Sequence, residues 1–168
     1  MTIVVSAGNE GIDLDHDANL FADFCERPGV VCVSATGPNS SGPDFNGPFL
    51  PSVDAPAFYT NFGRSAIDVA APGGDAVLDA VGNVLSAGWV WGPCSTTSLL
   101  IPDCQADIFV LGGIGTSFAA PHAAAVAALL VERLGRNPAL VRARLEQSAD
   151  QLGSSSVPIE TRTGGIRA

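Results

Sequence analysis

A chain of 168 residues with 46% hydrophobic residues is long and apolar enough to fold as one domain with a substantial core. Eight basic residues stand against seventeen acidic ones, and the net charge of −9 excludes a surface built to bind nucleic acid. No apolar run reaches the roughly 18 to 20 residues that a membrane-spanning helix needs, so we expect no membrane partner. The first residues also lack the basic and apolar regions of a signal peptide.

The chain opens on a short β-branched strand, Ile3-Val4-Val5, which runs into a turn from Ala7 to Gly11. A simple hairpin turn is one interpretation of this pattern. The alternative is a functional role for Asn9, because sites in open α/β sheets form beyond the carboxyl ends of parallel strands.

The next stretch, residues 12–28, is polar and places Asp13, Asp15, His16 and Asp17 close together. Alternating carboxylates ligate calcium in some loops, but the glycine and the bidentate glutamate of an EF-hand loop are out of register here. We therefore favour a solvated loop, and calcium stays an unassigned alternative.

The middle of the chain is β-rich. Residues 30–36 form a clear apolar strand, and residues 37–56, rich in Gly, Pro, Asn and Ser, predict a long surface loop. Residues 77–91 have the pattern of a single hairpin. Trp89 and Trp91 occupy alternate positions and share one face, for which we predict core packing rather than substrate binding.

Four cysteines form two locally spaced pairs, Cys25 with Cys32 and Cys94 with Cys104. The spacing lacks the Cys-x-x-Cys arrangement of structural zinc sites, and four cysteines permit three disulfide connectivities. We favour local pairing. Two disulfides suit an oxidising compartment, so we expect a secreted or otherwise extracytoplasmic protein.

The chain is organised around Gly115-Thr116-Ser117-Phe118-Ala119-Ala120-Pro121-His122 and the apolar run that continues to Leu134. Thr116 or Ser117 can cap the amides at the start of a helix, and Pro121 is tolerated if it lies in the first turn. Apolar side chains on nearly every face predict a buried helix. A serine at its positive end, after a glycine, is well placed to be a nucleophile, although simple capping is the alternative.

A second helix is predicted after Asn137, its cap, and Pro138, its first residue. Apolar residues continue at helical spacing from Leu140 to Ala149.

Three segments carry a resemblance to the subtilisin-like serine proteases. The Gly115–His122 octapeptide resembles the family's nucleophile motif, Gly-Thr-Ser-x-Ala-x-Pro-His/x. Ala7-Gly8-Asn9-Glu10-Gly11 resembles the segment that supplies the oxyanion-hole asparagine, and residues 59–73 resemble the segment Ser-Asn-x-Gly…Asp-Val-x-Ala-Pro-Gly. The resemblance runs nearly end to end, with residues 37–58 and 92–106 matching poorly.

The resemblance implies an α/β fold: a partial subtilisin-like three-layer fold with a mostly parallel sheet and a buried nucleophile helix, with residues 1–168 as a single partial catalytic domain. It further implies a serine endopeptidase that hydrolyses protein or peptide substrates through an acyl-enzyme, with no organic cofactor.

The same resemblance assigns the site residues. Ser117 matches the nucleophile, and Asn9 matches the oxyanion-hole donor. Ser6, Ala7 and Gly8 match one wall of the substrate pocket. Asp68 matches a structural carboxylate at a strand edge and not the catalytic aspartate.

Subtilases carry their triad in the chain order Asp, His, Ser, and no motif for the first two precedes Asn9. We therefore expect that the N-terminal half bearing them is absent and that the chain alone is almost inactive. His122 lies one helical turn from Ser117, too near along the helix to act as its base. Two alternatives stay open: a pseudo-protease or binding module that keeps the shell, and an unrelated triad of Asp17, His16 and Ser117.

Overall fold

The computed structural model describes residues 1–16, 24–37, 55–78, 81, 84–99, 101–105 and 110–150. In chain order the elements are β1 (Ile3–Ser6), β2 (Val30–Gly37), β3 (Ala55–Pro56), β4 (Val69–Pro72), β5 (Asp75–Leu78), β6 (Val84–Gly88), β7 (Val90–Pro93), α1 (Pro102–Gln105), β8 (Val110–Gly113), α2 (Thr116–Leu134) and α3 (Pro138–Ser148).

A mostly parallel sheet forms the body of the protein, as predicted. Strand β2 lies at its centre and pairs in parallel with β1, Val4 opposite Val31, and with β4, Val33 opposite Val69. The short β3 pairs antiparallel with the end of β2. Every residue of β2 is buried, which is typical of a central parallel strand that is covered on both faces.

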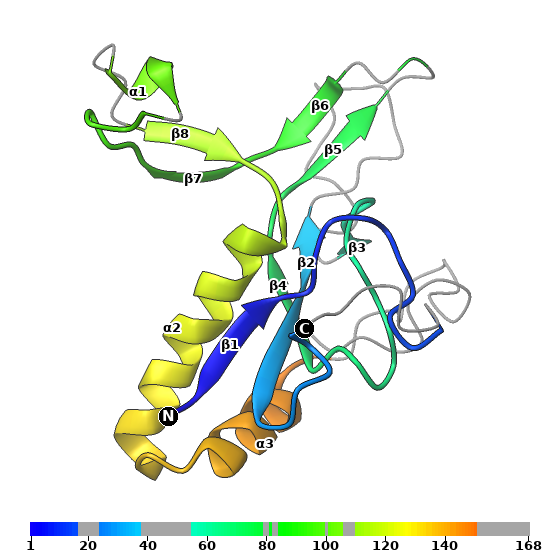
Figure 1. The fold of residues 1–168 in the computed structure, drawn as a ribbon, viewed down its shortest axis with the longest axis vertical. Helices are drawn as coiled ribbons and strands as arrows, with labels where there is room; N and C mark the ends of the chain where they lie inside the picture. Colours follow the sequence, from blue (N-terminus) through cyan, green and yellow to red (C-terminus); the bar gives the residue numbers. More distant parts are fainter. Residues whose placement is uncertain are drawn as a thin grey trace.

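Two hydrophobic clusters cover the two faces of this sheet. The larger joins alternate residues of β2 and β4 to α2 and α3, and its buried members are Val31, Val33, Ala35, Ala57, Tyr59, Val69, Ala71, Ala119, Ala123, Ala127, Val141 and Leu145. The smaller, on the opposite face, contains Ala7, Leu14, Cys25, Cys32, Ile67 and Ala70. Helix α2 lies along β1, β2 and β4, with α3 packed against it (Figure 1).

Helix α2 is buried along one stripe and not all round, which corrects the prediction from its composition. Ala119, Ala123 and Ala127 are buried, whereas Val126 is 46% and Leu129 65% exposed. By length and composition alone α2 would also suit a membrane span, contrary to our expectation. An alanine-rich sequence does not reveal which faces are covered, and in the described part of the chain the sheet and α3 cover only one side.

The prediction of a single hairpin over residues 77–91 is wrong in its second half. Strand β5 pairs antiparallel with β6, but Val90 and Trp91 turn away and belong to β7, which pairs with β8 in a second hairpin. This second hairpin extends away from the sheet (Figure 1).

The predicted local pairing of the cysteines is confirmed. A disulfide joins Cys94 and Cys104 across the far end of the second hairpin, and another joins Cys25 and Cys32.

Core packing of the two tryptophans is also wrong. Trp89 is 44% exposed and Trp91 66% exposed. Both rings lie over Gly112 of β8: a methyl group there would meet atoms of both side chains at 3.0 to 3.1 Å. Their alternate positions along the chain correctly predict that both side chains share one face. That face belongs to a two-stranded sheet, and no second layer covers it among the described residues.

Candidate active site

Ser117 lies at the amino-terminal end of α2, where it is exposed as the second residue of the helix. The cap residue is Gly115, whose φ of 148° favours glycine and which has no side chain to cap the helix. The expected capping by Thr116 or Ser117 is therefore wrong. Pro121 is the sixth helical residue rather than part of the first turn, so the Ser117 carbonyl receives no bond from an amide at that position.

The side chain of Thr116 faces inward and joins the two predicted site segments. Its backbone N–H and its Oγ1 hydroxyl both donate to Oδ1 of Asn9, each at 2.9 Å, and the N–H of Gly8 donates to Oγ1 at 3.1 Å. Segments 107 residues apart are thereby brought together. The two donated bonds also fix which way the Asn9 amide faces, since its oxygen is the acceptor for both. Its Nδ2 group has no hydrogen-bond acceptor among the described residues.

Tyr59 holds the segment on which the start of α2 rests. The carbonyl oxygens of Gly73 and Gly74 lie 2.9 and 2.7 Å from its hydroxyl and share its single hydrogen, and burial raises the pKa of Tyr59 well above the ordinary value. The N–H of Gly115 donates to the Gly73 carbonyl at 2.9 Å. A methyl group on Gly73 would meet the Ala35 side chain at 2.5 Å, so this close approach requires glycine. A neutral tyrosine thus fixes the backbone that positions Gly115, two residues before Ser117.

The predicted wall of the substrate pocket leads directly into the Asn9 turn. Ser6 ends β1, and Ala7 continues the ladder by donating its N–H to the Val33 carbonyl at 2.9 Å. The Ala7 side chain is buried in the smaller cluster, so only backbone atoms of this residue face the turn. Gly8, with a φ of 97°, is partly buried beside Thr116.

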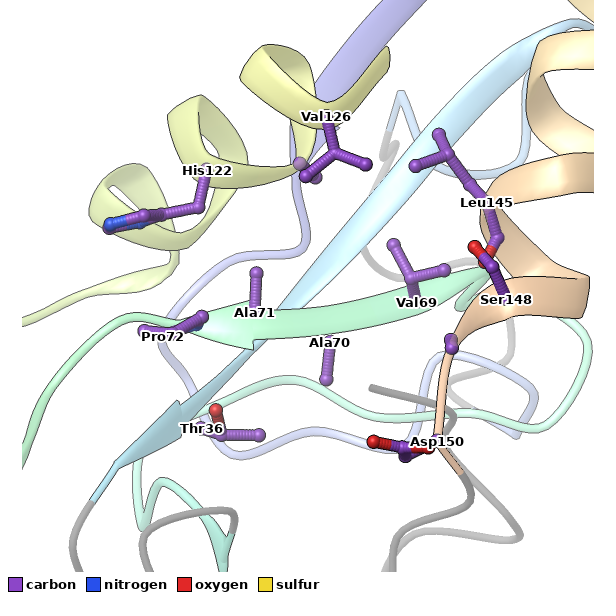
Figure 2. Close-up of a pocket in the computed structure, with 12 residues that line it drawn as sticks. Thr36, Val69, Ala70, Ala71, Pro72, His122, Val126, Leu145, Ser148 and Asp150 are labelled. Carbon is purple, nitrogen blue, oxygen red and sulfur yellow. The ribbon is translucent and has the colours of Figure 1, made fainter. Parts of the chain in front are cut away.

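Neither histidine of the sequence bonds to the Ser117 hydroxyl in the described residues. Nδ1 of His122 lies 2.8 Å from the Phe118 carbonyl, and Figure 2 shows its ring beside Ala71 and Pro72, at one end of a pocket between α2, β4 and the end of α3. Nδ1 of His16 lies 2.9 Å from the Asp13 carboxylate, whose hydrogen bond raises the pKa of this exposed ring.

The acidic stretch forms no metal site among its described members. Asp15 accepts backbone N–H bonds from Arg64, Ser65 and Ala66, and these bonds lower its pKa despite partial burial. Within the described ranges no three His, Cys, Asp or Glu side chains are grouped to hold an ion. Asp17, a member of the alternative triad, falls outside the residues that the structure describes.

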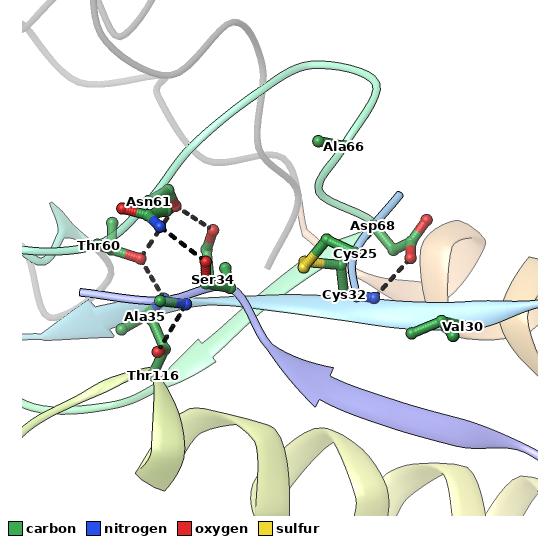
Figure 3. Close-up of a disulfide and its surroundings, with 12 residues drawn as sticks. Cys25, Val30, Cys32, Ser34, Ala35, Thr60, Asn61, Ala66, Asp68 and Thr116 are labelled. Carbon is green, nitrogen blue, oxygen red and sulfur yellow. Dashed lines mark hydrogen bonds between the residues drawn. A yellow bond between two sulfur atoms is a disulfide. The ribbon is translucent and has the colours of Figure 1, made fainter. Parts of the chain in front are cut away.

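Asp68 has a structural environment. Its carboxylate accepts the N–H of Cys32 at 2.7 Å and forms an ion pair with Arg142 of α3. Figure 3 shows the carboxylate pointing to the β2 backbone beside the Cys25–Cys32 disulfide. Burial raises its pKa, while the bond from Cys32 and the charge of Arg142 act in the opposite direction. Asp68 therefore joins β2 to α3, far along the sheet from Ser117.

Sequence reasoning missed two supporting roles. The sequence predicts a cap role for Thr116, and it gives Asn61 no role beyond its place in the segment 59–73 that resembles the family. The available signal is that Asn61 stands between Tyr59 and Phe62, two aromatic residues that favour burial. A buried amide needs several partners, but the sequence does not say which ones.

Comparison with known families agrees with this geometry. The model of the subtilase family matches residues 1–164. The chain belongs to the subtilase family. No curated protein matches it individually.

Solved structures of proteases share the fold. They include a lanthipeptide protease (25% identity, TM-score 0.59, 92% of this chain and 44% of that one). A cold-adapted subtilisin-like serine proteinase has 22% identity and a TM-score of 0.52, over 96% and 42% of the two chains. The epidermin leader peptide processing serine protease of Staphylococcus aureus has 18% identity and a TM-score of 0.56, over 96% and 37%. The chain thus spans less than half the length of each of these structures.

Proposed function

We propose that this chain is the serine-bearing part of a subtilisin-like endopeptidase, with Ser117 as the nucleophile. The observation that carries the proposal is the contact between Asn9 and Thr116 directly beside Ser117. The proposal is supported by the closeness of an amide side chain, the amino-terminal end of a helix and an exposed hydroxyl in this contact. Membership of the subtilase family over residues 1–164 supports the same assignment.

The chemistry follows from these groups. The Ser117 oxygen attacks a peptide carbonyl while a base takes its proton, and the carbonyl oxygen becomes negative. The N–H of Ser117, in the first turn of α2 and without a partner among the described residues, donates to that oxygen together with Nδ2 of Asn9. The positive end of α2 adds to the stabilisation. Collapse of the intermediate expels the amine with the proton and leaves an acyl-enzyme, which water then hydrolyses.

The base is proposed to come from outside the 168 residues. His122 shares the helix with Ser117, and His16 bonds to Asp13, so neither bonds to the Ser117 hydroxyl in the described structure. We propose that a further segment supplies the triad aspartate and histidine and that the isolated chain is almost inactive. Removing the general base of such a triad costs several orders of magnitude in rate.

Substrate and location are proposed at the level of class. The substrate is a protein or peptide, as for the family, and export to an oxidising compartment is supported by the two disulfides. No organic cofactor is needed. Calcium is not included in the proposal, because Asp13 and Asp15 are engaged with His16 and with backbone amides.

A fluorophosphonate probe followed by mass mapping tests the proposal. With the chain alone we expect almost no labelling. After addition of a subtilase segment that carries the Asp and His, we expect labelling at Ser117. Ser117→Ala should abolish it, and Ser95→Ala, at another exposed serine, should not. Labelling of Ser117 in the chain alone would overturn the proposal that the base lies outside the 168 residues. His16 would then be the first base to examine. Absence of labelling in both experiments would overturn the assignment of Ser117 as the nucleophile.

One observation favours a second candidate, a protein-binding module without catalysis. The hairpin β7–β8 exposes Trp89 and Trp91 and leads directly to the start of α2. The two candidates differ in the same labelling experiment, because a binding module does not require a reactive Ser117.

A further inference from the structure

The most extensively bonded side chain near the candidate site is Asn61, which lies in the segment before β4 and is only 2% exposed. Its Nδ2 donates to the Ala7 carbonyl and to Oε2 of Glu10, both at 2.8 Å. Its Oδ1 accepts the N–H groups of Glu10 and Ile12, both at 3.0 Å. The four bonds use both hydrogens and both lone pairs of the amide, and all of them go to the turn that carries Asn9.

This turn depends on bonds from outside itself. Gly8 and Gly11 have φ values of 97° and 67°, so the backbone leaves the strand conformation twice within four residues. The described structure gives the amides of Glu10 and Ile12 no acceptor other than Asn61. The backbone N–H of Asn61 also donates to the Gly8 carbonyl at 3.1 Å. Without the Asn61 side chain, two donors and one carbonyl of the turn would lose a partner, at a cost of about 1 to 3 kcal/mol for each group that stays buried.

We infer that Asn61 is a positioning residue of the oxyanion site, acting through Asn9. Asn9 lies between Gly8 and Glu10, both of which contact Asn61, and its own amide meets Thr116. Asn61 bonds to neither Asn9 nor Ser117 in the described structure. It fixes the position of the turn, and Thr116 then fixes the direction of the amide. A displacement of about 1 Å at a catalytic donor can cost as much as a hundredfold in rate.

The anchoring of Asn61 itself makes this support rigid. Figure 3 shows Asn61 beside Thr60 and Ser34, above β2. The Ser34 hydroxyl donates to the Asn61 carbonyl at 2.7 Å, while the Thr60 hydroxyl accepts the N–H of Ala35 at 2.9 Å. Strand β2 therefore fixes the position of Asn61, which in turn fixes the turn that carries Asn9.

The test has one arm that needs no activity and one that rests on the proposed function. In the first, hydrogen exchange of the Glu10 and Ile12 amides is measured in the full chain. We expect Asn61→Ala to accelerate both by more than about tenfold, because their acceptor is lost. Thr36→Val is the matched control, since this β2 threonine is equally buried, lines the pocket beside β4, and its side chain bonds to neither Asn61 nor the turn in the described structure. Unchanged exchange in Asn61→Ala, or equal acceleration in Thr36→Val, would overturn the inference.

In the second arm, the chain is combined with the segment that supplies the Asp and His, and peptide hydrolysis is measured. Asn61→Ala should lower kcat by about 10- to 100-fold with KM nearly unchanged, and Thr36→Val should not. Unchanged kcat would overturn the positioning role. If the wild-type combination hydrolyses nothing, the proposed function fails, whereas the exchange arm still decides whether Asn61 holds the turn. Should Asn61→Ala not fold, Asn61→Leu takes its place, because leucine fills a similar volume but offers no acceptor to the Glu10 and Ile12 amides.

Discussion

Gly8 shows how tightly single residues are constrained beside the proposed oxyanion site. Its φ of 97° disfavours any side chain, and an added methyl group would meet Nδ2 of Asn61 at 2.5 Å and Oε2 of Glu10 at 2.6 Å. Gly8→Ala should therefore lower the free energy of unfolding by about 3 kcal/mol, from backbone strain and overpacking together. Urea denaturation of the full chain measures this loss.

Gly29 supplies the control for this substitution. Its φ of 83° imposes a similar strain, but no atom lies within 4 Å of the added methyl group. Gly29→Ala should cost about 1 kcal/mol, from conformation alone. Equal losses in the two variants would show that the contact with Asn61 and Glu10 is easily relieved, and that the turn is less rigid than argued.

At this scale the sequence could predict which two motifs carry the proposed site residues, but not the contacts that hold the motifs together. Asn9 and Ser117 each lie in a recognisable motif, and the structure brings these motifs together. Thr116, which links the two motifs, is not the predicted cap: a threonine at a helix start usually is one, and the sequence cannot show that this hydroxyl faces a second segment. Asn61 is linked to the turn across about 50 residues, a distance over which no local pattern operates.

Among the elements, α3 is fixed to the sheet through one partly buried ion pair. Arg142 bonds to Asp68 at the edge of β4, to Glu146 at 2.9 Å and to the Val30 carbonyl at 3.4 Å. Arg142→Met keeps the aliphatic contact but leaves the buried Asp68 carboxylate without its cation. Since Arg142 is about one-third exposed, we expect a loss of about 2 kcal/mol rather than the larger loss of a fully buried pair.

A double-mutant cycle tests this explanation. In an Asp68→Asn background no buried charge remains, so Arg142→Met should cost at least about 1 kcal/mol less than in the wild-type chain. Unfolding free energies of the four proteins provide the measurement. A cost independent of the residue at position 68 would mean that Arg142 acts through packing or through Glu146 instead.

The elements were predicted well where the pattern was local and poorly where it depended on neighbours. The cap Asn137, which accepts the Leu140 N–H at 3.3 Å, and Pro138 as first residue of α3 are confirmed. The exposed tryptophans and the one-sided burial of α2 were not foreseen. An apolar sequence indicates that one face of a helix or strand favours burial. It does not say which other segment packs against that face.

At the scale of the whole molecule, the acidic residues do not all affect stability in the same way, because the fold raises the pKa of one carboxylate and lowers that of another. Asp75 is buried where β5 begins, and its carboxylate accepts the N–H of Ala76 at 2.8 Å and faces the Tyr59 region. Burial raises the pKa of Asp75 above its ordinary 3.8, although bonds from Ala76 and Phe58 lower it in part. Asp15 is the opposite case, since four hydrogen bonds from residues 64–66 lower its pKa.

These directions predict a pH dependence that two neutral variants can separate. A raised pKa means that the stability contributed by Asp75 is present below 3.8 and is lost as pH rises through the folded-state pKa. Asp75→Asn should therefore match the wild type near about pH 3 and be more stable near about pH 7. Asp15 contributes stability above 3.8 that is lost as pH falls, so Asp15→Asn should be the less stable protein at neutral pH and converge with the wild type in acid. Urea midpoints across this pH range measure both differences. A stability change of the same sign in the two variants at neutral pH would contradict these pKa directions. At Asp75 the effect of burial outweighs that of the hydrogen bonds, whereas at Asp15 the hydrogen bonds together outweigh burial.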